Sequence, residues 1–197
     1  RDFTEGMAVI SSKILGRPGR RGNQFIVNVS GRGIYSLVYP SKKPLWRNAK
    51  LRDSRFAAGR KGFFYTASEN GKVDCCTWKR GQIKWSRDLG TKLNRRAYCI
   101  SGSLILSSPN KGIMALDYQS GYNRWHIEGK CVEHETLMTP LGFLVRLAPA
   151  PYFLILSPID GSIRNKLHHW KRPTACAPTV MGEELVFAYG NDLIVCH

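Results

Sequence analysis

A spacing of about forty residues between matching positions constrains the fold of this 197-residue chain more than any other feature. Tryptophans recur at intervals of 39 and 40 residues, at Trp46, Trp85 and Trp125. Glycines recur at intervals of 40 residues, at Gly81, Gly121 and Gly161. A period near forty with several short strands in each unit is typical of the blades of a β-propeller. The chain is 43% hydrophobic, which is enough to fill a core between such blades.

The third unit shows the pattern most clearly. Residues 104–108 predict a strand, residues 109–111 a tight turn, and residues 112–118 a second strand. A second turn at residues 119–121 leads into a third strand that contains Trp125. This pattern predicts an antiparallel meander, and helical periodicity is absent from almost all of the chain.

The sequence therefore predicts an all-β fold, a five-bladed β-propeller of four-stranded antiparallel blades in a single domain covering residues 1–197. The predicted blades are residues 16–50, 51–89, 90–127, 128–168 and 169–197. The fifth blade lacks an outer strand, and residues 7–15 form a strand-like segment outside the other blades. We expect this N-terminal strand to complete the last blade, because closure leaves no open sheet edge.

The segment Gly-Ile-Met-Ala-Leu-Asp-Tyr-Gln-Ser-Gly-Tyr-Asn-Arg-Trp, residues 112–125, resembles the repeat of PQQ-like, quinoprotein-type β-propellers. Asp117, Gly121 and Trp125 fit that repeat, whereas the fourth unit has Asn165 where tryptophan is expected. Known members with eight blades include quinoprotein dehydrogenases and an outer-membrane assembly lipoprotein, so five units are few. The resemblance implies the fold, and because the repeated tryptophan and glycine are structural, we expect no quinone or other cofactor.

Charge is distributed unevenly along the chain, which has a formal net charge of +16. Residues 1–100 hold 22 Lys and Arg against 6 Asp and Glu, whereas residues 101–197 hold 8 of each. This asymmetry favours a polyanionic partner, either nucleic acid, acidic lipid, acidic polysaccharide or an acidic protein. The alternative interpretation is a basic surface that only confers solubility.

Three consecutive loops predicted to connect the blades, residues 16–23, 50–55 and 90–96, hold three basic residues each. If they surround one mouth of the central channel, their guanidinium groups are suited to binding phosphate oxygens in a bidentate manner. Nucleic acid is the favoured ligand, with an acidic protein as an alternative partner. The candidate anion-binding residues are Arg17, Arg20, Arg21, Arg52, Arg55, Lys92, Arg95, Arg96, Lys171 and Arg172.

An enzyme is the alternative in a different functional class. Glu133, His134 and Glu135 begin a predicted channel-lining strand, and a histidine beside carboxylates and arginines can act as a general base. The substrate would carry phosphate or carboxylate groups, for a nuclease-like or lyase-like reaction. Against this, strand alternation directs His134 away from both glutamates.

The six cysteines have no Cys-x-x-Cys spacing, so we predict no metal site and interpret them as small core residues of a reducing compartment. No apolar run is long enough to span a bilayer, and no signal peptide is recognisable. The sequence does not fix the compartment: a monomeric protein inside the cell is favoured, and a nuclear or an organellar location stays open. The chain starts at Arg1, so a removed leader and a longer parent chain both stay open.

Overall fold

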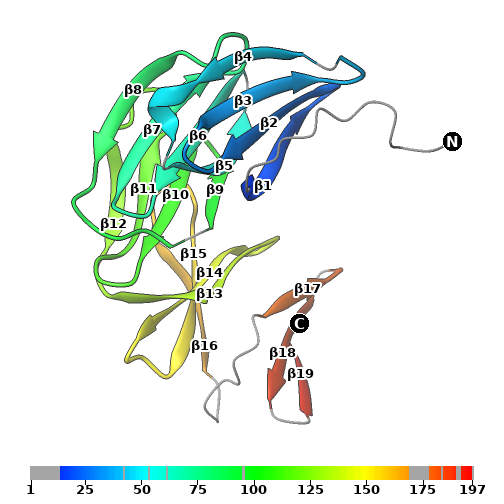
Figure 1. Ribbon diagram of the computed structural model, residues 1–197. Coiled ribbons are helices and arrows are strands. Elements are labelled where there is room, and N and C mark those ends of the chain that lie inside the picture. The colour runs from blue at the N-terminus through cyan, green and yellow to red at the C-terminus, as the bar shows by residue number, and fades with distance from the viewer. Residues whose placement is uncertain are drawn as a thin grey trace, which may run out of the picture. The chain divides into compact units, whose positions relative to one another are not determined.

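The computed structural model describes residues 14–41, 43–52, 54–60, 62–94, 96–168, 178–182, 184–189 and 192–196. In these residues the fold is all-β, with five antiparallel sheets and one short 3-10 helix (Figure 1). Contacts divide the chain into two units, residues 1–95 and 96–197, and each is described by itself. The predicted all-β class is confirmed. The prediction of a single domain is not tested and stays a prediction.

The first unit contains two four-stranded meanders, each in the order in which its strands occur along the chain. The first sheet comprises β1 (Ile14–Arg21), β2 (Gln24–Val29), β3 (Gly33–Val38) and β4 (Pro44–Asn48). The 3-10 helix η1 (Ala49–Leu51) follows it. The second sheet comprises β5 (Ser54–Arg60), β6 (Phe63–Ser68), β7 (Lys72–Thr77) and β8 (Ile83–Asp88).

The second unit contains three sheets. The third sheet comprises β9 (Ala97–Ile100), β10 (Ser103–Ser108), β11 (Gly112–Asp117) and β12 (Asn123–Ile127). The fourth comprises β13 (Lys130–Thr139), β14 (Gly142–Ala148), β15 (Tyr152–Leu156) and β16 (Ile163–His168). The last has three strands in the described residues, β17 (Thr179–Met181), β18 (Glu184–Tyr189) and β19 (Asp192–Cys196).

One prediction about the first sheet is wrong. The sequence suggested a loop at residues 16–23, but β1 extends to Arg21 and pairs with β2, from Ile14 opposite Val29 to Arg21 opposite Gln24. Pro18 is accommodated because the register shifts between Leu15 and Gly19, so no ladder donor is required there. The expected closing strand lies mostly in residues 1–13, outside the described residues, and closure stays a prediction.

A β-bulge accompanies the repeated tryptophan. In each of the first four sheets, the register between the third and fourth strands shifts by one residue just before the tryptophan position. In the first sheet, Ser36 lies opposite Trp46 while the next residue lies opposite Pro44. The extra residues are Leu45, Lys84, Arg124 and Arg164. Because a bulge bends its strand, the backbone bends at the same interval of about forty residues at which the sequence repeats.

The tryptophans dock one sheet onto the next. Within the first unit, Trp46 Nε1 donates a hydrogen bond to the Trp78 carbonyl oxygen at 2.9 Å, and a Cβ at Gly81 would lie 2.5 Å from the Trp46 ring. Within the second unit, Trp125 Nε1 donates to the Pro158 oxygen at 3.4 Å, and a Cβ at Gly161 would lie 2.8 Å from that ring. The predicted structural role of these tryptophans is confirmed.

Buried apolar side chains fill the space between the docked sheets. Phe64 stacks on Trp46 at 5.8 Å between ring centroids and meets Trp78 edge to face at 5.7 Å. Cys75 and Cys76 are buried in β7, and burial raises the pKa of the Cys75 thiol to about 11. No helix among the described residues is long and apolar enough to cross a membrane.

Candidate functional site

The two ends of the first unit's sheets differ in charge, and backbone contacts define which residues lie at each end. Gly22 and Asn23 form the turn between β1 and β2. The Tyr39 N–H donates to the Asn23 oxygen at 2.9 Å, which holds the connection from β3 to β4 beside that turn. In the second sheet, the Trp78 N–H donates to the Gly62 oxygen at 2.9 Å and joins the two equivalent connections.

These connections of the two sheets lie together. Gln24 Nε2 donates to the Trp78 oxygen at 2.9 Å, and Arg21 Nη1 lies 3.8 Å from the position of a Cβ at Gly62. Arg20 and Arg21 are thus at the end where the first two strands of each sheet join. The expectation that they line the same rim as Arg52 is wrong, because the first β-hairpin places them at the opposite end of the strands from Arg52.

We call this end of the first unit the basic end. Its members are exposed cationic residues from four segments of the two sheets, namely Arg20, Arg21, Lys43, Lys79, Arg80 and Lys84. The acidic residues in the described part of the unit are Glu69, Asp74 and Asp88. Glu69 and Asp88 lie at the other end, and Asp74 is only 1% exposed. In the described residues, no carboxylate therefore offsets the cations of the basic end.

The arginines of the first hairpin are held in defined positions. Arg20 Nε donates to the Gly22 oxygen at 3.0 Å, and its guanidinium carbon lies 5.7 Å from the centroid of the Phe25 ring. Only Nε of the Arg20 guanidinium group donates to the turn in these contacts. The donors on its two terminal nitrogens can therefore face the solvent. The basic end therefore includes an arginine whose position is fixed by the turn and by the Phe25 ring.

The same turn in other sheets shows that folding does not require cations at this position. The turns after β7, β11 and β15 have the same bond, from the glycine N–H to the oxygen four residues earlier, at 2.8, 2.8 and 2.9 Å. Where the first unit has Lys79 and Arg80, the later turns have Gln119 with Ser120 and Ile159 with Asp160. Hydrogen bonds from the Ser157 side chain and from Ser162 lower the pKa of Asp160 to about 2, so it is anionic at neutral pH.

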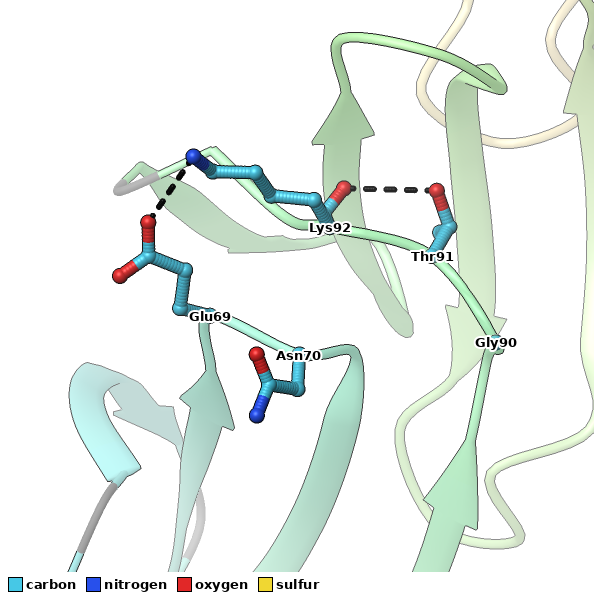
Figure 2. Close-up of a pocket in the computed structure, with 5 residues that line it drawn as sticks. All are labelled: Glu69, Asn70, Gly90, Thr91 and Lys92. Atoms are coloured by element: carbon cyan, nitrogen blue, oxygen red, sulfur yellow. Dashed lines mark hydrogen bonds and ion pairs between the residues drawn. The ribbon is translucent and has the colours of Figure 1, made fainter.

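The opposite end of the first unit is more nearly neutral. Lys92 Nζ forms an ion pair with Glu69 Oε1 at 3.0 Å, and Lys72 Nζ lies 3.7 Å from Asp74 Oδ1. Figure 2 shows this ion pair between Lys92 and Glu69. Both residues line a hollow of about 370 Å³. The hollow is lined by Glu69, Asn70, Gly90, Thr91 and Lys92. Arg32 and Arg52 are exposed at this end, but carboxylates lie among these cations.

The other predicted anion-binding residues are not brought together in the described structure. Arg17 lies in β1 and Arg55 in β5, and their side chains are outside the described residues. Arg96, in the second unit, is exposed and donates from Nη1 to the Thr136 oxygen at 3.4 Å. Arg95, Lys171 and Arg172 lie outside the described residues.

The proposed catalytic triplet lies inside a strand. Glu133, His134 and Glu135 belong to β13, where the register shifts between Cys131, opposite Leu147, and Thr136, opposite Val145. Five steps along β13 therefore match two along β14, so simple alternation does not fix the directions of these side chains. The side chains themselves are outside the described residues, and the enzyme interpretation stays untested. No group of metal-binding side chains occurs in the part of the chain that the structure describes.

Lys43, Lys79 and Arg80 are not among the anion-binding residues predicted from the sequence. Asp160, which replaces a cation in the equivalent turn after β15, belongs to the second unit. The signal that was available was the absence of Asp and Glu from residues 14–52, next to a second blade with only four.

Comparisons with known proteins support the fold. Neither the protein-family models nor the curated proteins include a match. Among solved structures, BamB from Moraxella catarrhalis superimposes with a TM-score of 0.70 at 16% identity, over 95% of this chain and 60% of that one. The quinohemoprotein alcohol dehydrogenase from Comamonas testosteroni gives 0.65 at 12% identity, over 90% and 40%.

A computationally designed protein, Ika8, is also similar, with a TM-score of 0.68 at 8% identity over 90% of this chain and 56% of that one. The chain thus spans 60% or less of these three solved structures. BamB and the dehydrogenase are β-propellers of the PQQ-repeat type, and the chain shares that blade architecture. At these identities the likeness shows the fold alone.

Proposed function

We propose that this protein binds a polyanion, with nucleic acid as the favoured ligand, through the basic end of its first unit. The observation that carries the proposal is the group of exposed cations from Arg20 to Lys84 that no described carboxylate of the unit accompanies. The arginines of the first hairpin and the cations of the β7 turn belong to connections that lie together, because Gln24 donates to the Trp78 oxygen and Arg21 lies beside Gly62. Guanidinium and ammonium groups so placed neutralise successive phosphates.

The comparison between equivalent turns supports this proposal over a purely structural role. The β7 turn and the β15 turn have the same hydrogen bond, but one has Arg80 where the other has Asp160. Cations at such a position raise the local potential, which costs stability through repulsion. A ligand that neutralises them gives a physical reason for their presence.

We infer that the five sheets are five successive blades of one propeller, each about forty residues long. The last sheet has three strands in the described residues, and residues 7–13 would supply its fourth. The repeated tryptophan docking in both units supports the same relation between neighbouring blades.

The test removes equal charge from the two ends. One variant carries Arg21→Gln, Lys79→Gln and Arg80→Gln at the basic end. The matched control carries Arg32→Gln, Lys50→Gln and Arg52→Gln, which are exposed at the opposite end. Binding of a fluorescein-labelled 20-nucleotide single strand, the matching duplex and heparin is followed by anisotropy from 50 to 300 mM salt.

We expect the basic-end variant to weaken binding and to reduce the slope of log K against log salt by about 2, since each lost phosphate contact contributes roughly 0.7 to 0.9. The opposite-end control should keep most of the wild-type slope. Equal losses in the two variants, or a larger loss in the control, would contradict the proposed location. Failure of the wild-type protein to bind any of the three polyanions would overturn the function, and capture of an acidic protein instead would replace it.

A further inference from the structure

Tyr39 is an exposed aromatic side chain at the basic end. Tyr39 is 66% exposed, although it follows directly after the last residue of β3. The backbone on both sides is fixed, because the Tyr39 N–H donates to the Asn23 oxygen at 2.9 Å and Asn23 Nδ2 donates to the Tyr39 oxygen at 3.4 Å. A ring presented to solvent from an anchored backbone loses little conformational entropy when a ligand packs on it.

The strand register places Tyr39 near the arginines of the first hairpin. Val38, the residue before Tyr39, lies opposite Gln24, which in turn lies opposite Arg21. Neighbouring strands are about 4.8 Å apart, so Tyr39 is only two strands and one residue step from Arg21. Asn23, which bonds Tyr39, follows Gly22, whose oxygen accepts the Arg20 Nε bond. Tyr39 and both arginines therefore belong to one hydrogen-bonded corner of the first sheet.

We propose that the polyanion taken at the basic end is single-stranded nucleic acid and that one unpaired base stacks on Tyr39. This inference rests on the proposed function. A planar ring beside cations distinguishes nucleic acid from a sulfated glycan or a phosphopeptide without aromatic groups, because only a base offers a flat π-face next to phosphate. A duplex buries those faces between its own base pairs, so a single strand fits the corner better.

The experiment replaces the ring without changing charge. The variants are Tyr39→Ala, Tyr39→Phe and, as a matched control, Tyr122→Ala. Tyr122 is also 66% exposed and lies in the equivalent connection of the third sheet, but its turn includes Asp117 and has no Lys or Arg. The probes are a 12-nucleotide single strand, an abasic strand with the same number of phosphates, and heparin.

We expect Tyr39→Ala to weaken binding of the 12-nucleotide strand by about 5- to 100-fold, as loss of one stacked base does, with an unchanged salt slope. Tyr39→Phe retains the ring and should bind within about twofold of wild type. Tyr122→Ala should bind like wild type. Binding of heparin and of the abasic strand should not respond to Tyr39→Ala.

Two outcomes would overturn the inference. If Tyr39→Ala leaves the affinity for the 12-nucleotide strand unchanged while the basic-end triple variant weakens it, the polyanion site stands and base stacking is refuted. If Tyr39→Ala weakens binding of heparin and of the 12-nucleotide strand equally, the ring supports the local structure of the site and does not stack on a base. Failure of the triple variant to weaken binding is a separate result, which contradicts the proposed location of the polyanion site at the basic end.

Discussion

Replacing Gly81 by alanine tests how tightly one sheet is docked on the next. Gly81 has a φ of +65°, and a Cβ there would lie 2.5 Å from Cε3 and Cζ3 of Trp46. Two costs result. A left-handed backbone costs alanine about 1–2 kcal/mol, and forcing extra volume into a packed contact costs about 1–3 kcal/mol more. We therefore expect Gly81→Ala to lower the free energy of unfolding by about 2–5 kcal/mol.

Gly31→Ala is the matched control. Gly31 has a φ of +70° in the same unit, but nothing lies within 4 Å of its Cβ position. Only the backbone cost of about 1–2 kcal/mol applies. Urea unfolding followed by tryptophan fluorescence should therefore show a difference of about 1–3 kcal/mol between the two variants. Gly161→Ala and Gly182→Ala repeat the comparison in the second unit, where only Gly161 meets a tryptophan.

A double-mutant cycle identifies the cause of this difference. In a Trp46→Ala background the ring is absent, so Gly81→Ala should cost no more than Gly31→Ala. The reasoning would be refuted if Gly81→Ala were as mild as Gly31→Ala in the wild-type background. It would equally be refuted if the extra cost survived the removal of Trp46, since that result assigns the strain to other neighbours.

Two further predictions concern stability. Thr66 Oγ1 is buried and has no hydrogen-bond partner among the described residues, so Thr66→Val should raise the free energy of unfolding by about 1 kcal/mol in urea titrations. Thr139→Val should instead lower it by about 1 kcal/mol, because Thr139 Oγ1 donates to the Gly142 oxygen at 2.8 Å, and a loss for both variants would contradict the argument. Deleting residues 1–13 should lower the melting temperature if they close the last blade; a truncated chain that melts like the full chain would exclude closure by that segment.

The repeat was predictable because it depends on positions that only one residue type fills well. A turn glycine with positive φ and a tryptophan that packs on it can be recognised in any sequence, and Gly81 with Trp46 and Gly161 with Trp125 are such pairs. The bulge that precedes each tryptophan was not predicted. It changes pairing without changing the spacing of the recognisable residues, so nothing in the sequence marks it.

The ends of the sheets were harder to assign. Residues 16–22 include three glycines and a proline, which favour a loop, yet they form most of β1 because the register shift excludes Pro18 from the ladder. Successive turns of an antiparallel meander lie at opposite ends of its strands. A prediction that misses one strand therefore places the next turn at the wrong end. Arg20 and Arg21 were therefore assigned to the wrong rim. The ion pair of Lys92 with Glu69 depends on a contact between distant turns and could not be inferred from spacing.

The central claim is that the ligand lies at the basic end, and photocrosslinking tests it most directly. A 12-nucleotide single strand carrying a photoreactive base is crosslinked to the wild-type protein, and the modified peptides are identified by mass spectrometry. We predict crosslinks within residues 20–25, 39–45 and 78–84, which include Arg21, Tyr39 and Arg80. Crosslinks confined to residues 30–33, 49–52 and 69–72, at the opposite end, would contradict the account.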